Sequence, residues 1–159
     1  MALREILKKD QELLRKKSRP VEKFDDRLIT LLDDMKDTMQ SANGCGLAAP
    51  QIGVLRRVVV IEVPENEEDE NSKMRYFEII NPMYLKKEGE QRDYEGCLSC
   101  PGEYGITTRP AYVKIEAYDR FGKKISLDGE GLLARAICHE LDHLDGILFI
   151  DHAEMVEQE

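Results

Sequence analysis

The residues most able to do chemistry in this 159-residue chain are two histidines four positions apart. They belong to the sequence HELDH at positions 139–143, which has the H-E-x-x-H spacing. Side chains four apart lie one turn above each other on one face of a helix, so two imidazoles can bind the same cation. Glu140 can then reach a water molecule on that cation. The pattern predicts a divalent-metal site on a helix that runs from Gly131 to about Gly146.

A catalytic metal site needs a third protein ligand and one open position. The best candidate is Cys97, within the sequence EGCLS at positions 95–99, which gives a Cys-His-His site. Cys97 and Cys100 together with the two histidines also match a closed Cys2His2 structural zinc site. However, the familiar zinc finger has only about 12–15 residues between its cysteine and histidine pairs, far fewer than here. A closed site would also have no use for Glu140, so we favour the open one.

Two other kinds of protein remain as alternatives. The first is a zincin-like metallopeptidase that uses the same histidines with an acidic ligand downstream in place of Cys97. The second is a non-enzymatic protein that the closed Cys2His2 zinc site stabilises.

Two helices and several strands are expected to position these residues. Apolar residues at helical spacing predict a helix over Phe24–Met39, with Asp25 or Asp26 capping its start, and HELDH lies on the second helix. The stretch 44–53, rich in small residues, is expected to be a structured loop. Apolar or alternating runs predict strands over Arg57–Val63, Tyr76–Ile80, Tyr112–Tyr118 and Ile125–Leu127. Neighbouring strands joined by tight turns, together with two helices, indicate an α+β fold with antiparallel sheet.

The composition fits one globular domain over residues 1–159. Hydrophobic residues make up 42% and charged residues 35% of a chain whose formal charge is −9, and the excess acids lie mainly in a loop at 65–72 and a tail at 151–159. We expect no direct DNA binding, because a basic stripe for a phosphate backbone is not predicted. We also expect no membrane span and no export signal, which places the protein in the cytoplasm with reduced cysteines.

Three motifs in order resemble the signature sequences of the peptide deformylases. They are GCGLAAPQ at 44–51, EGCLS at 95–99 and HELDH at 139–143, and the similarity runs from about Leu3 to Phe149. The resemblance implies a single domain in which antiparallel sheets pack around the helix that bears the motif. It also implies removal of the N-formyl group from the formyl-methionine of nascent polypeptides, with release of formate. Fe²⁺ is the implied metal, replaceable by Zn²⁺, Ni²⁺ or Co²⁺, and a transient ribosome contact is a further expectation.

The resemblance also implies a role for each residue that matches the motifs. Cys97, His139 and His143 would be the metal ligands, and metal-bound hydroxide would attack the formyl carbon. Glu140 would act as the general base and then as the general acid. The side-chain amide of Gln51 and the backbone N–H of Leu98 would stabilise the oxyanion.

Other residues are expected to shape or support the site. Gly44, Gly46 and Leu47 would lie against substrate, and Arg135 would border the substrate pocket because it lies one turn before His139. Three more residues are expected to orient the ligand imidazoles or to pair with one another: Glu95, Asp142 and Arg109. An exposed helix charge is an equal alternative for Asp142. The sequence departs from the common pattern of the family at Arg135, Cys138 and Tyr104.

Overall fold

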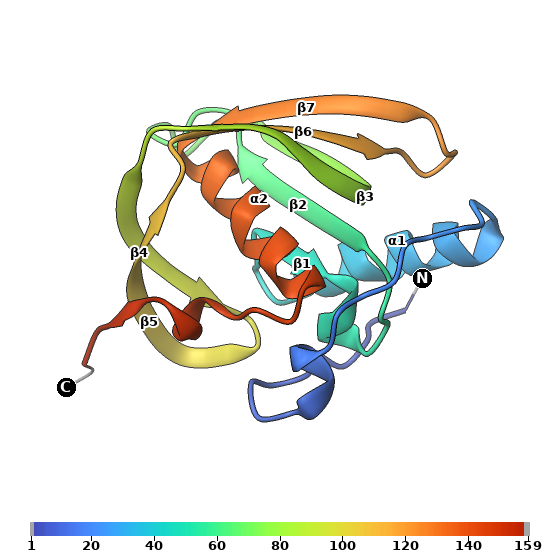
Figure 1. The fold of residues 1–159 in the computed structure, drawn as a ribbon, viewed down its shortest axis with the longest axis horizontal. Coiled ribbons are helices and arrows are strands. Elements are labelled where there is room, and N and C mark those ends of the chain that lie inside the picture. The colour runs from blue at the N-terminus through green and yellow to red at the C-terminus, as the bar shows by residue number, and fades with distance from the viewer. Residues whose placement is uncertain (1, 158–159) are drawn as a thin grey trace.

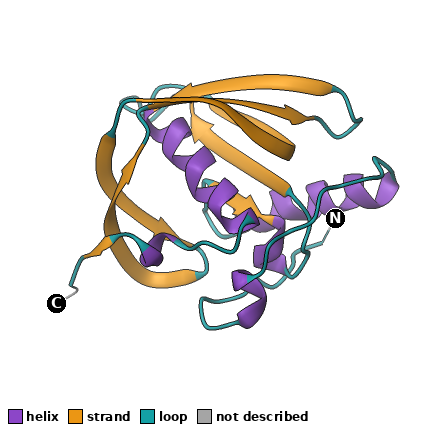
Figure 2. Ribbon diagram, in the orientation of Figure 1, coloured by secondary structure: helices purple, strands orange, loops and turns teal. Residues whose placement is uncertain are grey.

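Two antiparallel sheets and one central helix make up the computed structural model, which describes residues 2–157 (Figure 1). The five-stranded sheet has the order β1-β2-β3-β6-β7, and the three-stranded sheet has the order β4-β5-β8. Figure 2 shows α2 lying between the two sheets. The strands are β1 (Gly46–Ala48), β2 (Val58–Pro64), β3 (Met74–Glu88), β4 (Gln91–Cys97), β5 (Cys100–Arg109), β6 (Tyr112–Tyr118), β7 (Lys124–Glu130) and β8 (Glu154–Met155). Three 3₁₀ helices occupy Glu12–Arg15, Ala49–Ile52 and Phe149–Asp151.

The helix that carries HELDH, α2 (Gly131–Leu144), is buried on nearly every side. Its apolar residues pack against β2, β3 and β6 in one cluster, to which Leu133, Ile137, Leu141 and Leu144 contribute. The chain leaves the helix through Gly146, whose φ is +75°, and a Cβ there would overlap the backbone of Arg15. Glycine is therefore required at this position both for its conformation and for the close approach of another segment.

The other helix, α1 (Asp26–Ser41), begins and ends two residues later than predicted. Asp25 caps it by accepting a hydrogen bond from the Leu28 N–H at 3.3 Å. Its apolar face packs on β1, β2 and β3, where it meets Leu47, Val60 and Ile80. That face consists of Leu28, Leu31, Leu32, Met35 and Met39, as the helical spacing predicts.

The four strands predicted from apolar patterns are confirmed, and four others, β1, β4, β5 and β8, were missed. Within the expected loop 44–53, residues 46–48 form the short strand β1, which pairs with β2. Strands β4 and β5 form a hairpin that no apolar pattern indicated. Pro101, Gly102 and polar residues interrupt the alternation there, and much of the inward face of these strands is charged rather than apolar.

The acidic loop connects β2 with β3, and it reaches the start of α2. Glu130, the residue at the N-cap of α2, makes no capping hydrogen bond through its side chain. Instead, Glu67 accepts a hydrogen bond from the Leu132 N–H at 2.5 Å. A carboxylate at a helix N-terminus satisfies a free N–H group and interacts favourably with the helix dipole.

Two further expectations concern the membrane and the acidic tail. No helix among residues 2–157 is long and apolar enough to cross a membrane. Part of the tail expected at 151–159 forms β8, and residues 158 and 159 lie outside the described part of the chain.

We predict that Glu67→Ala lowers the free energy of unfolding by about 1 kcal/mol, because it removes the only side-chain cap observed on α2 among the described residues. Urea unfolding followed by circular dichroism measures the change. Glu68→Ala is the matched control, since it removes the same charge from the same loop without touching α2. Equal losses in the two variants would show that loop charge, rather than capping, is responsible.

Candidate metal centre

The three predicted metal ligands meet in space, although one of them lies far from the others in sequence. Cys97 ends β4, whereas His139 and His143 lie one turn apart on α2. The possible ligand atoms of all three lie within 4.8 Å of one another, and Cys97 Sγ is 3.4 Å from His143 Nε2. Within residues 2–157 this is the only group of three or more such side chains, and neither Cys100 nor a carboxylate completes it. The arrangement favours an open site with three ligands over both alternatives.

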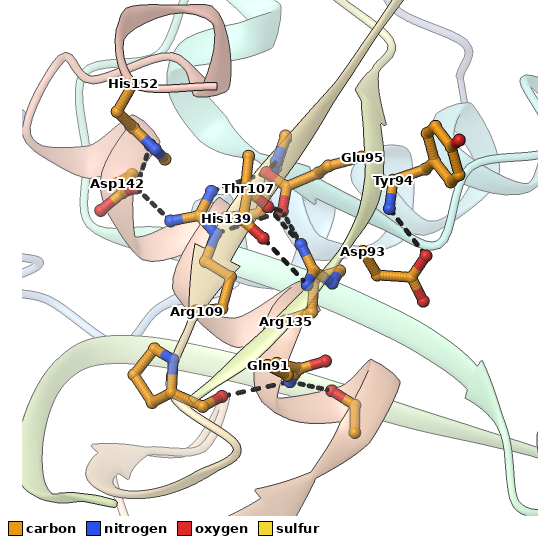
Figure 3. Close-up of polar contacts among 12 residues, drawn as sticks. Gln91, Asp93, Tyr94, Glu95, Thr107, Arg109, Arg135, His139, Asp142 and His152 are labelled. Carbon is orange, nitrogen blue, oxygen red and sulfur yellow. Dashed lines mark hydrogen bonds and ion pairs between the residues drawn. The ribbon is translucent and has the colours of Figure 1, made fainter. Parts of the chain in front are cut away.

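His139 is oriented by Glu95, the first residue of the EGCLS motif. Glu95 Oε2 lies 2.6 Å from His139 Nδ1, which leaves Nε2 to face the other ligands. Glu95 is itself buried and accepts hydrogen bonds from Arg109 at 2.6 and 3.1 Å, from Arg135 at 2.9 Å and from Thr107 at 2.9 Å. Figure 3 shows these side chains converging on the Glu95 carboxylate. Such a partner fixes both the tautomer and the ring orientation of a ligand histidine.

The electrostatics of this network keep Glu95 charged. Burial opposes ionisation, but hydrogen bonds from His139 and Arg109 hold the pKa of Glu95 well below its usual range. Arg109 also binds Asp142 at 2.7 Å, and Asp142 lies 3.7 Å from His152 (Figure 3). Asp142 is about one quarter exposed, so it is both a partially solvated helix charge and a partner of Arg109.

Arg135 borders the cavity, as predicted, but its guanidinium turns toward the Glu95 network rather than toward the cavity. It lines the cavity at the metal centre, whereas its guanidinium binds Glu95 and the hydroxyl of Thr107. The sequence analysis missed this contact and Thr107 as a whole. A signal was available, because Thr107 and Arg109 alternate along one strand and therefore face the same side.

Glu140 is buried beside the ligands, with one carboxylate oxygen lacking any hydrogen-bond partner among the described residues. Its Oε2 lies 4.0 Å from His139 Nε2, and burial raises the pKa of Glu140 to about 7. A Cβ at Gly46 would overlap this carboxylate, so glycine there makes room for it. A buried carboxylate without partners is costly unless another group binds it, and this fits a site that receives a metal and water.

Gln51 and Leu98 also lie beside the ligand group. Gln51 is almost completely buried, its side-chain oxygen accepts a hydrogen bond from the Ala48 N–H at 2.9 Å, and its Nε2 lies 3.6 Å from Cys97 Sγ. Nε2 also donates to Ser99 at 3.0 Å. Leu98 lies in the turn after Cys97, and its side chain contacts Gly44.

A cavity of about 380 Å³ opens beside these groups. Residues 42–46 and 94–98 form two of its walls, and α2 contributes Leu132, Arg135 and Ala136. Tyr104, one of the departures from the family pattern, also lines it. Leu47 was predicted to contact substrate but lies elsewhere. Its side chain is buried in the cluster against α1, because successive residues of a strand face opposite sides.

The fold and the centre define an α+β protein with a buried helix that offers two histidines and a glutamate beside a cysteine. The sequence profile described as polypeptide deformylase matches residues 3–159. The chain is 56% identical over 151 residues to a peptide deformylase of Caldicellulosiruptor bescii, covering 95% of this chain and 86% of that protein. It is 52% identical over 151 residues to one of Alkaliphilus metalliredigens, covering 95% of this chain and 97% of that protein.

Solved structures agree with these sequences. A peptide deformylase from Legionella pneumophila has a TM-score of 0.87 and 46% identity, covering 96% of this chain and 87% of that one. The enzyme from Ehrlichia chaffeensis in complex with actinonin has a TM-score of 0.90 and 35% identity, covering 97% and 90%. The chain therefore belongs to the polypeptide deformylase family, and both the family and the α+β fold predicted from the sequence are confirmed.

We predict that Cys97→Ser loses the bound metal whereas Cys100→Ser keeps about one ion per chain. Cys97 lies in the ligand group and Cys100 does not. Each variant is reconstituted with Zn²⁺, desalted and analysed by elemental mass spectrometry, with circular dichroism as the check on folding. Loss of zinc from a folded Cys100→Ser protein would instead indicate the closed four-ligand site.

Proposed function

We propose that this protein removes the N-formyl group from the formyl-methionine of nascent polypeptides and releases formate. The observation that carries the proposal is the juxtaposition, beside one cavity, of three possible ligand atoms and the buried carboxylate of Glu140, one of whose oxygens has no hydrogen-bond partner among residues 2–157. Membership of the polypeptide deformylase family supplies the substrate class.

The donor set supports a divalent ion held by Cys97, His139 and His143. We propose Fe²⁺ as the ion in the cell, with Zn²⁺, Ni²⁺ or Co²⁺ able to substitute, since one thiolate and two imidazoles suit all four. A divalent ion bound there lowers the pKa of water and polarises a carbonyl. Glu95, Arg109 and Asp142 then act on the reaction only through the orientation of His139.

Glu140 is proposed to handle the proton. Its carboxylate accepts a proton from the attacking water and donates it to the methionine nitrogen as the bond between that nitrogen and the formyl carbon breaks. Burial beside the ligand group supports this role, because one of the carboxylate oxygens has no hydrogen-bond partner to give up among the described residues. The products are formate and a free amine.

The charge that develops on the formyl oxygen needs donors on the other side of the centre. We propose that Gln51 Nε2 and the backbone N–H of Leu98 provide them. Rigid support for Gln51 comes from its hydrogen bond with the Ala48 N–H, which anchors the other end of the amide. Gly44 and Gly46 let the substrate backbone approach, while Leu132, Ala136 and the stem of Arg135 contact the methionine side chain.

The rest of the chain is assigned accordingly. We propose that residues 1–159 act as one catalytic domain in the cytoplasm, where the thiols stay reduced and where nascent chains emerge from ribosomes. A ribosome contact is part of this proposal.

We predict that Glu140→Gln lowers kcat/KM for a formyl-Met peptide by about 10²–10⁴-fold while retaining the metal, because the amide cannot accept the proton. Formate release measures the rate. Glu130→Gln, an exposed position at the start of the same helix, is the control and should keep normal activity. Full activity in Glu140→Gln would exclude the proposed proton transfer.

We predict that the iron form loses activity in air faster than the nickel or zinc form. Fe²⁺ and its thiolate ligand are readily oxidised, whereas Zn²⁺ has no redox chemistry. Protein purified under argon is loaded with each metal in turn, and formate release is followed after exposure to air. The assignment of iron would be contradicted if zinc copurified with the protein under argon and if the activity of all metal forms declined at the same rate in air.

A further inference from the structure

A basic cleft lies at the end of α1 that is remote from the metal centre. It encloses about 490 Å³, against about 380 Å³ for the cavity beside the ligands. Its charged lining comprises five cations and two acids: Arg4, Arg19, Lys23, Arg27, Arg56, Glu22 and Asp25. In a chain whose formal charge is −9, this is a local reversal of sign.

Most of these cations are free to bind an external anion. Arg4 forms an ion pair with Asp34 at 2.8 Å, whereas the other four make no ion pair with any residue of 2–157. Asp25, one of the two acids, already accepts the capping hydrogen bond of α1. Arg19, Lys23 and Arg27 are exposed, and Arg56 is half-buried.

The backbone that carries two of the arginines is fixed rather than loose. Arg19 and Arg56 form a parallel β-bridge, in which the Arg19 N–H donates to Leu55 at 3.1 Å and the Arg57 N–H donates to Arg19 at 3.0 Å. The next turn of chain is tied down by Asn81, whose side chain makes two hydrogen bonds to the backbone of Val21 at 2.8 and 2.9 Å. The backbones of Arg19 and Arg56 are therefore held side by side before any ligand arrives, which lowers the entropic cost of bringing their side chains to one ligand.

The floor of the cleft is apolar, so a suitable anionic ligand must also carry apolar groups. Val21, Leu28, Leu31 and Val54 line it beneath the charged rim. A ligand that suits both parts has several negative groups along a backbone and flat apolar groups beside them. Single-stranded RNA has this chemistry, because guanidinium groups bind phosphates in a forked geometry and unpaired bases stack on the planes of other guanidinium groups.

We propose that this cleft binds a single-stranded segment of RNA, and that it is the surface by which the enzyme contacts the RNA of the ribosome. That the RNA is ribosomal rests on the proposed function. That the ligand has a phosphate backbone rests on the charges of the cleft. The 16 residues of α1 separate the cleft from residues 42–46 of the active cavity, a span of about 24 Å. Figure 1 shows α1 running from the edge of the molecule toward β1 and α2, so the cleft and the active cavity lie at opposite ends of this helix.

The binding test uses the full-length, metal-loaded protein and a fluorescent 16-nucleotide RNA of mixed, unpaired sequence. Anisotropy titrations from 50 to 200 mM salt should give a Kd on the order of 10⁻⁵ M at low salt that weakens as salt rises, as phosphate contacts require. Arg19→Glu with Arg56→Glu should weaken binding at least tenfold. The slope of log K against log salt should become shallower by about 1.4, the value for two lost contacts to a single strand.

The matched control is Lys114→Glu with Lys123→Glu, two exposed lysines on and after β6 that make no ion pair among the described residues. It changes the net charge equally, so it should affect the Kd far less than the cleft variant. A second cleft variant, Lys23→Glu with Arg27→Glu, should behave like the first, and thermal unfolding checks that all variants fold. Sedimentation with ribosomes should follow the same order.

Three outcomes would overturn the proposal. Equal weakening in the cleft and control variants would reduce the effect to net charge, and a Kd insensitive to salt would exclude phosphate contacts. Tighter binding of a poly-glutamate peptide than of the RNA would assign the cleft to an acidic protein instead. Formate release from a free formyl-Met peptide should be unchanged in every variant. A failure of RNA binding would therefore leave the proposed deformylase activity intact. A failure of deformylation would likewise leave the result for RNA binding intact.

Discussion

The buried carboxylate of Glu95 is the interaction on which the rest of the centre depends. It belongs to β4 yet binds His139 of α2, and residues of β5 and α2 donate to it. The hairpin of β4 and β5 has few apolar residues facing inward, so this polar network is what docks it against the helix. Cys97 follows Glu95 by two residues, and the same docking therefore brings the Cys97 thiol to the two histidines of the candidate ligand group.

Such a network is stable only because its charges balance. Glu95 and Asp142 face Arg109 and Arg135, and each buried oxygen of Glu95 has at least two partners. Loss of one partner of a buried pair typically costs about 3–5 kcal/mol, because the remaining charge is left without compensation. Glu140 is the contrasting case, since one of its oxygens is buried with no partner among the described residues. The fold thus separates carboxylates that hold the site from the one that is left free to react.

Charge is also segregated over the molecule as a whole. The acids of the loop after β2 lie at the start of α2, where Glu67 caps the helix, and the cations of the N-terminal segment line the cleft at the start of α1. A net charge therefore predicts little about any one surface. The formal charge of −9 indicated no basic stripe. However, Arg19 and Arg56 come together through a β-bridge between segments that are distant in sequence.

The sequence by itself determined the family, both long helices and which three side chains form the candidate ligand group. Those features depend on short-range spacing: the histidines are four apart on one helix, and apolar residues recur at helical or strand intervals. It did not reveal β4 and β5, the carboxylate that pairs with Arg135 or the burial of Leu47 against α1. Tertiary structure alone decided these, because a polar strand has no apolar period to detect and because the direction of a side chain depends on which distant element packs against it.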